Sequence, residues 1–312
     1  MRKRSNVLIA GLAAFVLVLS ACATEGQDRP VTMARADWGS GHMQAAIYAQ
    51  LIEELGYEVT DPALAELQPF SFYPALAAGQ YDLWANGWFP NHDIFLEGEN
   101  VTGQAVELPI EPVGYEVAKG GVEGWMVDKA TADRLGITSM ADVAANVGVF
   151  DSNGNGKADL IGCNAGWGCN TWINDVIADR NWDAAVEQVV GDYDDLVGGV
   201  IDRVNAGESV LFYAYTPNWT ANSLVAGDNV VWVYEHGVND IRAVANTDFL
   251  DDNPDIRRLL EVVAIPLSDI AAQNARMAAA DEYSDADVEA DAEAWIASNR
   301  DRVDSWLEIA RG

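Results

Sequence analysis

The chain of 312 residues is 50% hydrophobic and contains 11 Trp, which is enough apolar surface for a well-packed protein of two lobes. Its 18 Lys and Arg against 49 Asp and Glu leave a formal net charge of −31, which excludes nucleic acid as an expected partner because phosphate binding requires clustered basic side chains. The same acidity suits either a high-salt environment or a cationic ligand, and composition leaves both open.

The first 22 residues have the pattern of an export signal. Basic residues at positions 2–4 precede an uncharged apolar run at residues 7–19, which is too short to span a bilayer but fits the centre of a signal peptide. The run ends in Leu19-Ser20-Ala21-Cys22, which resembles a bacterial lipobox and predicts a lipoprotein signal peptide at residues 1–21 with lipidation of Cys22. The alternative is ordinary signal-peptidase cleavage near residues 21–23. Either way we expect an exported protein, in the periplasm or on the outer cell surface, and lipidation of Cys22 would hold it to the membrane by a lipid anchor alone.

Strand and helix patterns alternate along the rest of the chain, which is typical of an α/β protein. Strands are predicted at residues 31–34, 57–60, 82–88, 209–215 and 229–234, and an extended, glycine-rich crossover at residues 111–127. Helices are predicted at residues 40–55, 72–78, 131–135, 140–146, 170–181, 193–206, 254–263, 268–279 and 285–309. The return of helices at the end of the chain favours a first lobe built from residues 22–118 and 241–312, with residues 119–240 inserted as a second lobe.

Three aromatic residues lie where predicted strands or loops end, and such positions are where α/β proteins bind ligands. Trp88 ends one strand, Tyr215 ends another, and Trp167 lies in the glycine-rich loop Gly162-Cys163-Asn164-Ala165-Gly166-Trp167-Gly168-Cys169. Three such rings predict an aromatic cage, which holds a quaternary ammonium group by cation–π attraction. Trp38, between the first strand and the first long helix, is a further candidate wall. The alternative for each ring is an ordinary place in the core.

The cysteines predict a disulfide. Once Cys22 is lipidated, Cys163 and Cys169 remain, and an even number in an exported protein pairs by default. A rival interpretation is an exported cysteine hydrolase that uses Cys169 as the thiol and His92 as the base. No CxxC, HExxH or GxSxG pattern supports a metal or serine enzyme.

The acidic segment at residues 151–159 begins like a calcium-binding loop, but its twelfth position is Gly162 instead of Glu. Its candidate ligands are Asp151, Asn153, Asn155 and Asp159. The same side chains also form Asx-turns, which bend a chain without any metal. We favour the turns, and calcium stays open as the alternative.

The chain resembles the substrate-binding proteins of glycine betaine/proline betaine ABC importers, most closely the enterobacterial periplasmic form. The similar segments lie at residues 55–59, 88–93, 150–169, 211–219 and 270–275, and the run Gly162 to Cys169 is highly specific. The resemblance implies a two-lobed type II periplasmic-binding-protein fold, with a hinge between the lobes that closes on the ligand. It also implies an osmoprotective receptor that is not an enzyme, needs no cofactor, acts as a monomer and delivers its ligand to a transmembrane permease.

The resemblance also assigns the ligand contacts. Trp88 and Trp167 match two of the three cage tryptophans of the enterobacterial relative, and Tyr215 stands in the third place. The ligand carboxylate falls to the side chain of His92 and the backbone of Gly168 and Cys169. Donation from an imidazole to a carboxylate favours the charged ring. Choline, carnitine and dimethylsulfoniopropionate are the alternative ligands.

Overall fold

The structure is a computed structural model that describes residues 29–99 and 104–312. The signal peptide predicted at residues 1–21 and the lipidation predicted at Cys22 therefore lie outside the described residues. The strands are β1 (Met33–Ala36), β2 (Glu66–Leu67), β3 (Leu83–Phe89), β4 (Glu97–Glu99), β5 (Ala105–Glu107), β6 (Ile110–Asp128), β7 (Ala158–Ile161), β8 (Val186–Val189), β9 (Leu211–Thr216) and β10 (Val230–Asn246). The α-helices are α1 (His42–Glu54), α2 (Pro69–Ala77), α3 (Lys129–Leu135), α4 (Met140–Ala145), α5 (Gly168–Asp179), α6 (Tyr193–Ala206), α7 (Thr247–Asp252), α8 (Pro254–Val262), α9 (Leu267–Ala279), α10 (Asp285–Ser298) and α11 (Arg300–Arg311).

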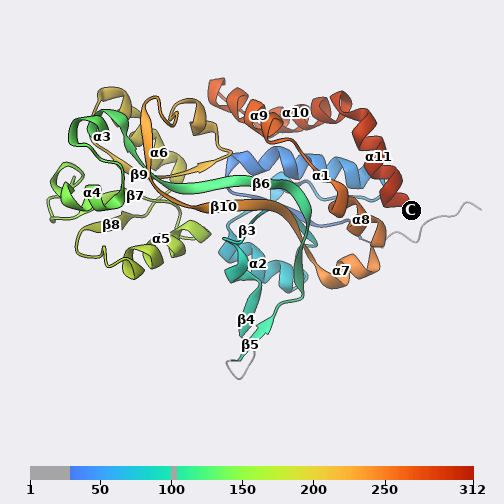
Figure 1. Ribbon diagram of the computed structural model, residues 1–312. Helices are drawn as coiled ribbons and strands as arrows, with labels where there is room; N and C mark the ends of the chain where they lie inside the picture. Colours follow the sequence, from blue (N-terminus) through green and yellow to red (C-terminus); the bar gives the residue numbers. More distant parts are fainter. Residues whose placement is uncertain (1–28, 100–103) are drawn as a thin grey trace, which may run out of the picture.

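Eight strands form one mixed sheet in the order β2-β1-β3-β10-β6-β9-β7-β8, and two long central strands join its halves (Figure 1). β6 has 19 residues and β10 has 17, and the two pair antiparallel from one half of the molecule to the other. Helices α1, α7, α8, α10 and α11 lie around the half that contains β3, and α3 to α6 around the half that contains β9 (Figure 1). The α/β class is confirmed, and the crossover predicted at residues 111–127 is part of β6.

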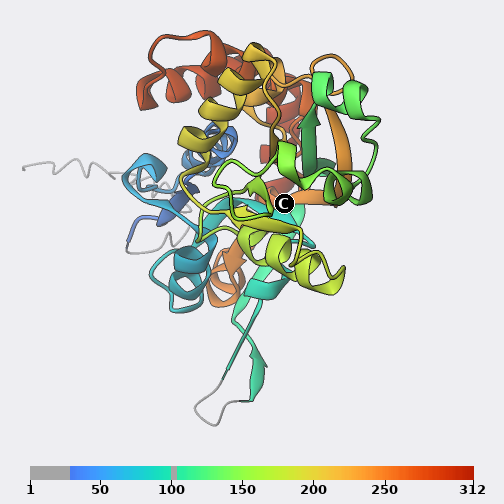
Figure 2. The same cartoon turned by 90° about the vertical axis from the view of Figure 1, so that its left-hand side faces the viewer.

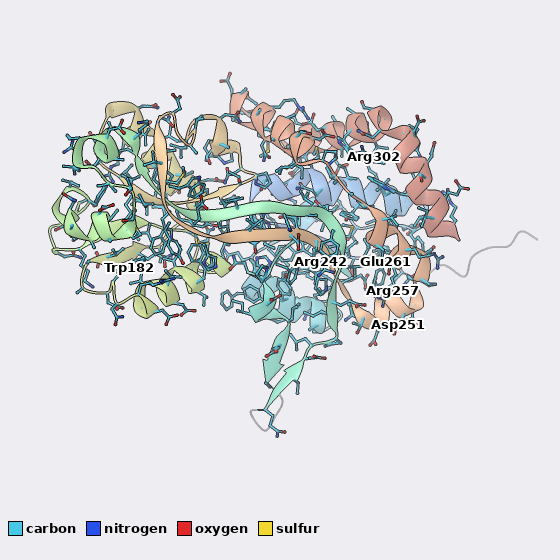
Figure 3. All side chains as sticks on the ribbon, viewed as in Figure 1. Trp182, Arg242, Asp251, Arg257, Glu261 and Arg302 are labelled. Atoms are coloured by element: carbon cyan, nitrogen blue, oxygen red, sulfur yellow. A yellow bond between two sulfur atoms is a disulfide. The ribbon has the colours of Figure 1, made fainter. Side chains whose placement is uncertain are left out.

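Each half packs around one fully buried tryptophan. In the first half, Trp84 on β3 lies 4.5 Å from Phe72 of α2, measured between ring centroids. In the second, Trp125 on β6 stacks on Trp172 of α5 at 6.1 Å and contacts Trp182 (labelled in Figure 3) at 5.8 Å. Burial of such large side chains is a major source of stability. Each half thus has its own buried tryptophan, and the buried apolar residues of both halves form one continuous core.

Arg242 on β10 ties the long strands together in the first half (Figure 3). Its Nε donates to the carbonyl of Gly114 at 2.7 Å, its Nη2 donates to the carbonyl of Pro112 at 2.8 Å, and its guanidinium carbon lies 4.7 Å from the centroid of the Tyr115 ring. Gly114 itself has a φ of +62°, and a Cβ there would lie 2.0 Å from the Leu260 carbonyl oxygen. Glycine is needed at this bend both for its conformation and for the close approach of α8.

Two sequence predictions are wrong in detail. Residues 57–60 make only an isolated bridge between Val59 and Val31, and the strand that pairs with β1 on that side is the short β2. The helix predicted at residues 285–309 is two helices, α10 and α11, because Asn299 leaves the helical conformation with φ −114° and ψ 23°. The Asn299 side chain donates to the carbonyl of Trp295 at 2.9 Å and so caps α10. Asn competes for backbone hydrogen bonds in this way at helix ends.

Several short elements were not predicted. They include α7, the parallel strands β7 and β8, and the hairpin β4–β5, which projects from the first half in both views (Figures 1 and 2). The strand predicted at residues 229–234 continues to Asn246 and becomes β10. Within the described residues, no helix is long and apolar enough to cross a membrane.

Candidate functional site

A pocket lies between the two halves of the molecule. β3 and β9 run in opposite directions in the sheet, so their carboxyl ends meet here from opposite sides. All seven residues predicted to contact the ligand line this pocket: Trp38, Trp88, His92, Trp167, Gly168, Cys169 and Tyr215. Four lining residues were not predicted, namely Pro69, Asn91, Glu123 and Tyr213. The structure thus brings the predicted set together.

The aromatic rings meet at steep angles, like adjoining walls of a box. Trp88 and Tyr215 have ring centroids 5.7 Å apart and an interplanar angle of 83°. Trp167 meets Tyr215 at 6.0 Å and 83°, and meets Trp38 at 5.4 Å and 73°. Edge-to-face contacts of this kind are favourable for aromatic pairs. The four rings therefore support one another around the pocket.

One amide holds two of these walls. The side-chain oxygen of Asn86 accepts a hydrogen bond from the indole nitrogen of Trp38 at 2.9 Å and from that of Trp88 at 2.8 Å. Asn86 and Trp88 are two residues apart on β3, so their side chains lie on the same face of the strand. Sequence reasoning missed Asn86 because a single Asn in an apolar strand has no pattern of its own.

Trp167 is held by a residue from the opposite half of the molecule. Its indole nitrogen donates to Oδ1 of Asp37 at 2.7 Å, although the two residues are 130 positions apart. Burial raises the pKa of Asp37 to about 6, while hydrogen bonds from Trp167 and Gln68 act in the opposite direction. A partly buried carboxylate thus fixes one aromatic wall from across the pocket.

His92 is a neutral hydrogen-bond donor. Its Nδ1 accepts the backbone N–H of Trp88 at 3.1 Å and lies 3.0 Å from the hydroxyl of Tyr73. A backbone N–H only donates, so Nδ1 is the acceptor and the ring proton lies on Nε2. Burial lowers the pKa of His92 to about 3, which keeps the ring uncharged at neutral pH. The expectation of a charged imidazole is corrected to a neutral Nε2–H donor, since desolvation outweighs any gain from charge.

Gly168 and Cys169 are the first two residues of helix α5. The first N–H groups of a helix have no partner within the helix and carry its positive dipole end, which suits a carboxylate. A Cβ added to Gly168 would lie 3.4 Å from Nδ2 of Asn91 and 3.5 Å from Cδ2 of His92. Glycine thus leaves this corner of the pocket open.

The predicted disulfide between Cys163 and Cys169 is present. It connects the segment after β7 to the first turn of α5. The bridge lies directly beside the pocket, because Cys169 is a lining residue.

A chain that lacks residues 1–22 is expected to contain no free thiol, because Cys163 and Cys169 are then its only cysteines. Titration with a thiol reagent in denaturant should detect nothing before reduction and both cysteines afterwards. Free thiols in the oxidised, purified protein would contradict the pairing and restore Cys169 as a nucleophile.

The segment at residues 151–159 is folded by its own side chains. Asp151 accepts backbone N–H groups of Gly154 and Gly156 at 2.6 and 2.8 Å, and Asp159 accepts that of Ser152 at 2.7 Å. Asx-turns lie in the same segment, where Oδ1 of Asn153 accepts the N–H of Asn155 at 3.0 Å and Oδ1 of Asn155 accepts that of Lys157 at 2.9 Å, and the sequence favoured such turns over calcium. No group of three or more His, Cys, Asp or Glu side chains suited to a metal occurs within residues 29–99 and 104–312. Calcium binding by Asn153, Asn155 and the two acids stays an untested alternative.

Comparison with known proteins settles the family. Residues 29–298 match the model of the substrate-binding domain of ABC-type glycine betaine transport systems. The chain belongs to this family. It is the substrate-binding component of an ABC importer, as the resemblance predicted.

Individual relatives agree with the family model. The glycine betaine-binding periplasmic protein OusX of Dickeya dadantii is 32% identical and covers 86% of each chain. The glycine betaine/proline betaine-binding periplasmic protein of Salmonella typhimurium is 28% identical over 98% of each chain.

Solved structures confirm the two-lobed periplasmic-binding fold. A choline-binding protein of an ABC transporter, in complex with choline, superposes with a TM-score of 0.70 at 18% identity and covers 89% of this chain and 91% of its own. Lactococcal OpuAC, closed on glycine betaine, superposes with a TM-score of 0.68 at 15% identity and covers 90% and 100%. At these identities the likeness concerns the fold.

Proposed function

We propose that the protein captures glycine betaine or proline betaine outside the cytoplasmic membrane and delivers it to the permease of an ABC importer. The observation that carries this proposal is one pocket with two kinds of wall. Trp38, Trp88, Trp167 and Tyr215 surround it with aromatic faces, which attract a trimethylammonium group. At one corner, the Nε2–H of His92 and the first N–H groups of α5 offer donors for a carboxylate.

On this proposal, ligand binding closes a hinge between two lobes. One lobe comprises residues 22–118 and 241–312, and the other comprises residues 119–240. Support comes from irregular pairing of β6 and β10 near these limits, where the register shifts between Asn239 and Ile241. Lys119 there has a φ of +52°, which is uncommon for a residue other than glycine. The ligand contacts divide between the lobes, so a bound ligand favours the closed form over the open one.

The protein on this proposal is exported, acts as a monomer and carries a lipid at Cys22. The relatives named above are described as periplasmic, which supports export. The lipobox at residues 19–22 supports the anchor. The Cys163–Cys169 disulfide ties up the thiol that a cysteine hydrolase needs, which favours a binding protein over an enzyme.

Calorimetry tests the ligand. The domain without residues 1–22 is titrated with glycine betaine, proline betaine, choline and carnitine, at low and high salt. We expect tight binding of both betaines and weaker binding of choline, which has no carboxylate for His92 and α5. Stronger binding of choline would assign the pocket to a different quaternary amine. Heats no larger than dilution for every compound would reject the quaternary-amine proposal.

A further inference from the structure

Glu123 is the one acid among the described side chains that line the pocket. It lies on β6 and is only 3% exposed. Neither the cage nor the carboxylate corner described above uses it. A buried carboxylate is costly unless it is paired and hydrogen-bonded, because its charged form loses the solvation of water.

The partners of Glu123 are neutral donors from three different segments. Its Oε1 accepts the hydroxyl of Tyr213 on β9 at 2.6 Å. Its Oε2 accepts the side-chain amide of Asn239 on β10 at 2.8 Å and that of Asn91, which follows β3, at 3.0 Å. No salt bridge to Glu123 occurs among the described residues, so no cation compensates its charge. Burial outweighs the hydrogen bonds and raises the pKa of Glu123 to about 7.

Glu123 lies near the corner of the pocket that offers donors to a carboxylate. Asn91, which donates to Glu123, is also the residue that a Cβ on Gly168 would approach to 3.4 Å. A ligand carboxylate at the start of α5 would therefore lie close to Asn91, which in turn donates to Glu123. Two carboxylates that share such a site cannot both stay ionised without a penalty, and protonation of one of them relieves it.

We propose that Glu123 selects the charge class of the ligand: a zwitterion with a carboxylate binds when Glu123 is protonated, and a cationic quaternary amine such as choline binds better when Glu123 is ionised. This inference rests on the proposed function, since it assumes a quaternary-amine ligand. Binding of a betaine then takes up a proton from solvent onto Glu123. Binding of choline retains the negative charge, which attracts its ammonium group.

Four other titratable groups around the pocket stay uncharged near neutral pH. His92, beside Asn91, stays neutral because burial lowers its pKa to about 3. Tyr213 and Tyr215 on β9 and Tyr193 on α6 stay neutral because burial raises their pKa values.

Two further acids face the cage from other segments. Asp37, which holds Trp167, has a pKa of about 6, and burial raises the pKa of Asp194 on α6. Asp37 therefore titrates near the same range as Glu123, and its effect must be separated from that of Glu123.

The test is calorimetry of glycine betaine and choline with the domain without residues 1–22, at about pH 5.5 and about pH 8.5, on either side of the expected transition. Betaine needs the protonated carboxyl, so its affinity falls as the pH rises through the pKa of Glu123. We expect about a tenfold to thirtyfold loss for betaine, from the smaller population of the competent form, and a change in the opposite direction for choline. Betaine binding near neutral pH should also take up a proton, seen as a heat that varies with the ionisation enthalpy of the buffer.

Three variants test whether Glu123 causes the pH dependence of ligand affinity. Glu123→Gln should abolish the opposite pH responses of betaine and choline and weaken choline. Glu116→Gln is the matched control: Glu116 lies on the same strand, is also buried with a raised pKa, and does not line the pocket, so its pH response should equal that of the parent. Asp37→Asn should keep the opposite responses of the two ligands.

Several results would overturn the assignment to Glu123 while the proposed function stands. One is a betaine affinity that does not change with pH, and another is betaine binding without proton uptake. The others are betaine and choline that respond in the same direction, and opposite responses that persist in Glu123→Gln or disappear in Asp37→Asn. The proton-uptake measurement uses the unmodified sequence, so it still tests the proposal if a variant fails to fold. Absence of binding by every quaternary amine at both pH values would instead reject the proposed function, and this inference with it.

Discussion

Replacing Trp167 with alanine is expected to weaken glycine betaine binding about thirtyfold or more, while the protein still folds. A desolvated aromatic wall contributes on the order of 0.5–2 kcal/mol to cation binding, and each 1.4 kcal/mol or so is a factor of about ten. The substitution also removes ring contacts with Trp38 and Tyr215 and leaves Asp37 without its indole partner. These losses add to the loss of the wall itself, so we expect a larger drop in affinity here than for substitutions at the other cage residues.

Trp167→Phe separates the ring from its hydrogen bond. Phenylalanine keeps an aromatic face but has no N–H for Asp37, so we expect a loss between those of the parent and the alanine variant. Calorimetry gives the affinities, and a thermal melt of each variant verifies folding. Parent-like affinity in Trp167→Ala would show that this ring is no part of the cage.

His92→Ala is expected to weaken glycine betaine about tenfold to a hundredfold, because a hydrogen bond to a charged group contributes roughly 1.5–3 kcal/mol. Choline has no carboxylate, so its affinity should change much less. Tyr215→Ala is the complementary change: it removes a cage wall and should weaken both ligands together. The pair of variants thus distinguishes recognition of the carboxylate from recognition of the ammonium group.

Tyr73→Phe controls for indirect effects at His92. It removes the hydroxyl that lies 3.0 Å from Nδ1 but leaves the Trp88 backbone N–H on that nitrogen, so the Nε2–H donor is kept. We expect betaine affinity within a few-fold of the parent, from the modest net value of a neutral hydrogen bond. If His92→Ala and Tyr215→Ala both bind betaine like the parent, the assignment of the pocket is wrong.

The sequence predicted the elements whose pattern is local. The apolar periodicity of α1 and α6 and the apolar run of β3 are contained within each segment, and all three were found close to their final limits. β2, β7 and β8 have two to four residues each and depend on pairing with strands distant in the chain, for which a single sequence carries little signal. The break at Asn299 depends on one side-chain cap inside an otherwise continuous helical pattern.

The same division applies to the site. The rings and the glycine-rich loop were visible because aromatic residues and glycines at strand ends form a pattern. Asn86, Asp37 and Glu123 were not, because their meaning depends on partners far along the chain: Asp37 meets Trp167 at a separation of 130 residues, and Glu123 meets Asn239 at 116. An isolated polar residue in a strand looks the same whether it is a surface side chain or a buried acceptor.

The shared acceptor at Asn86 has a consequence for the energetics of capture. Trp38 and Trp88 are fixed by one amide oxygen of the protein itself, so the order of these two pocket walls does not depend on a contact from an osmolyte. Ordering a large side chain on binding costs about 0.5–1.5 kcal/mol, and a preorganised wall avoids that cost. The two rings also respond as a unit, so the effects of substitutions at Trp38 and Trp88 should not add. A receptor that must retain a small solute thus has two of its four aromatic walls preorganised for binding.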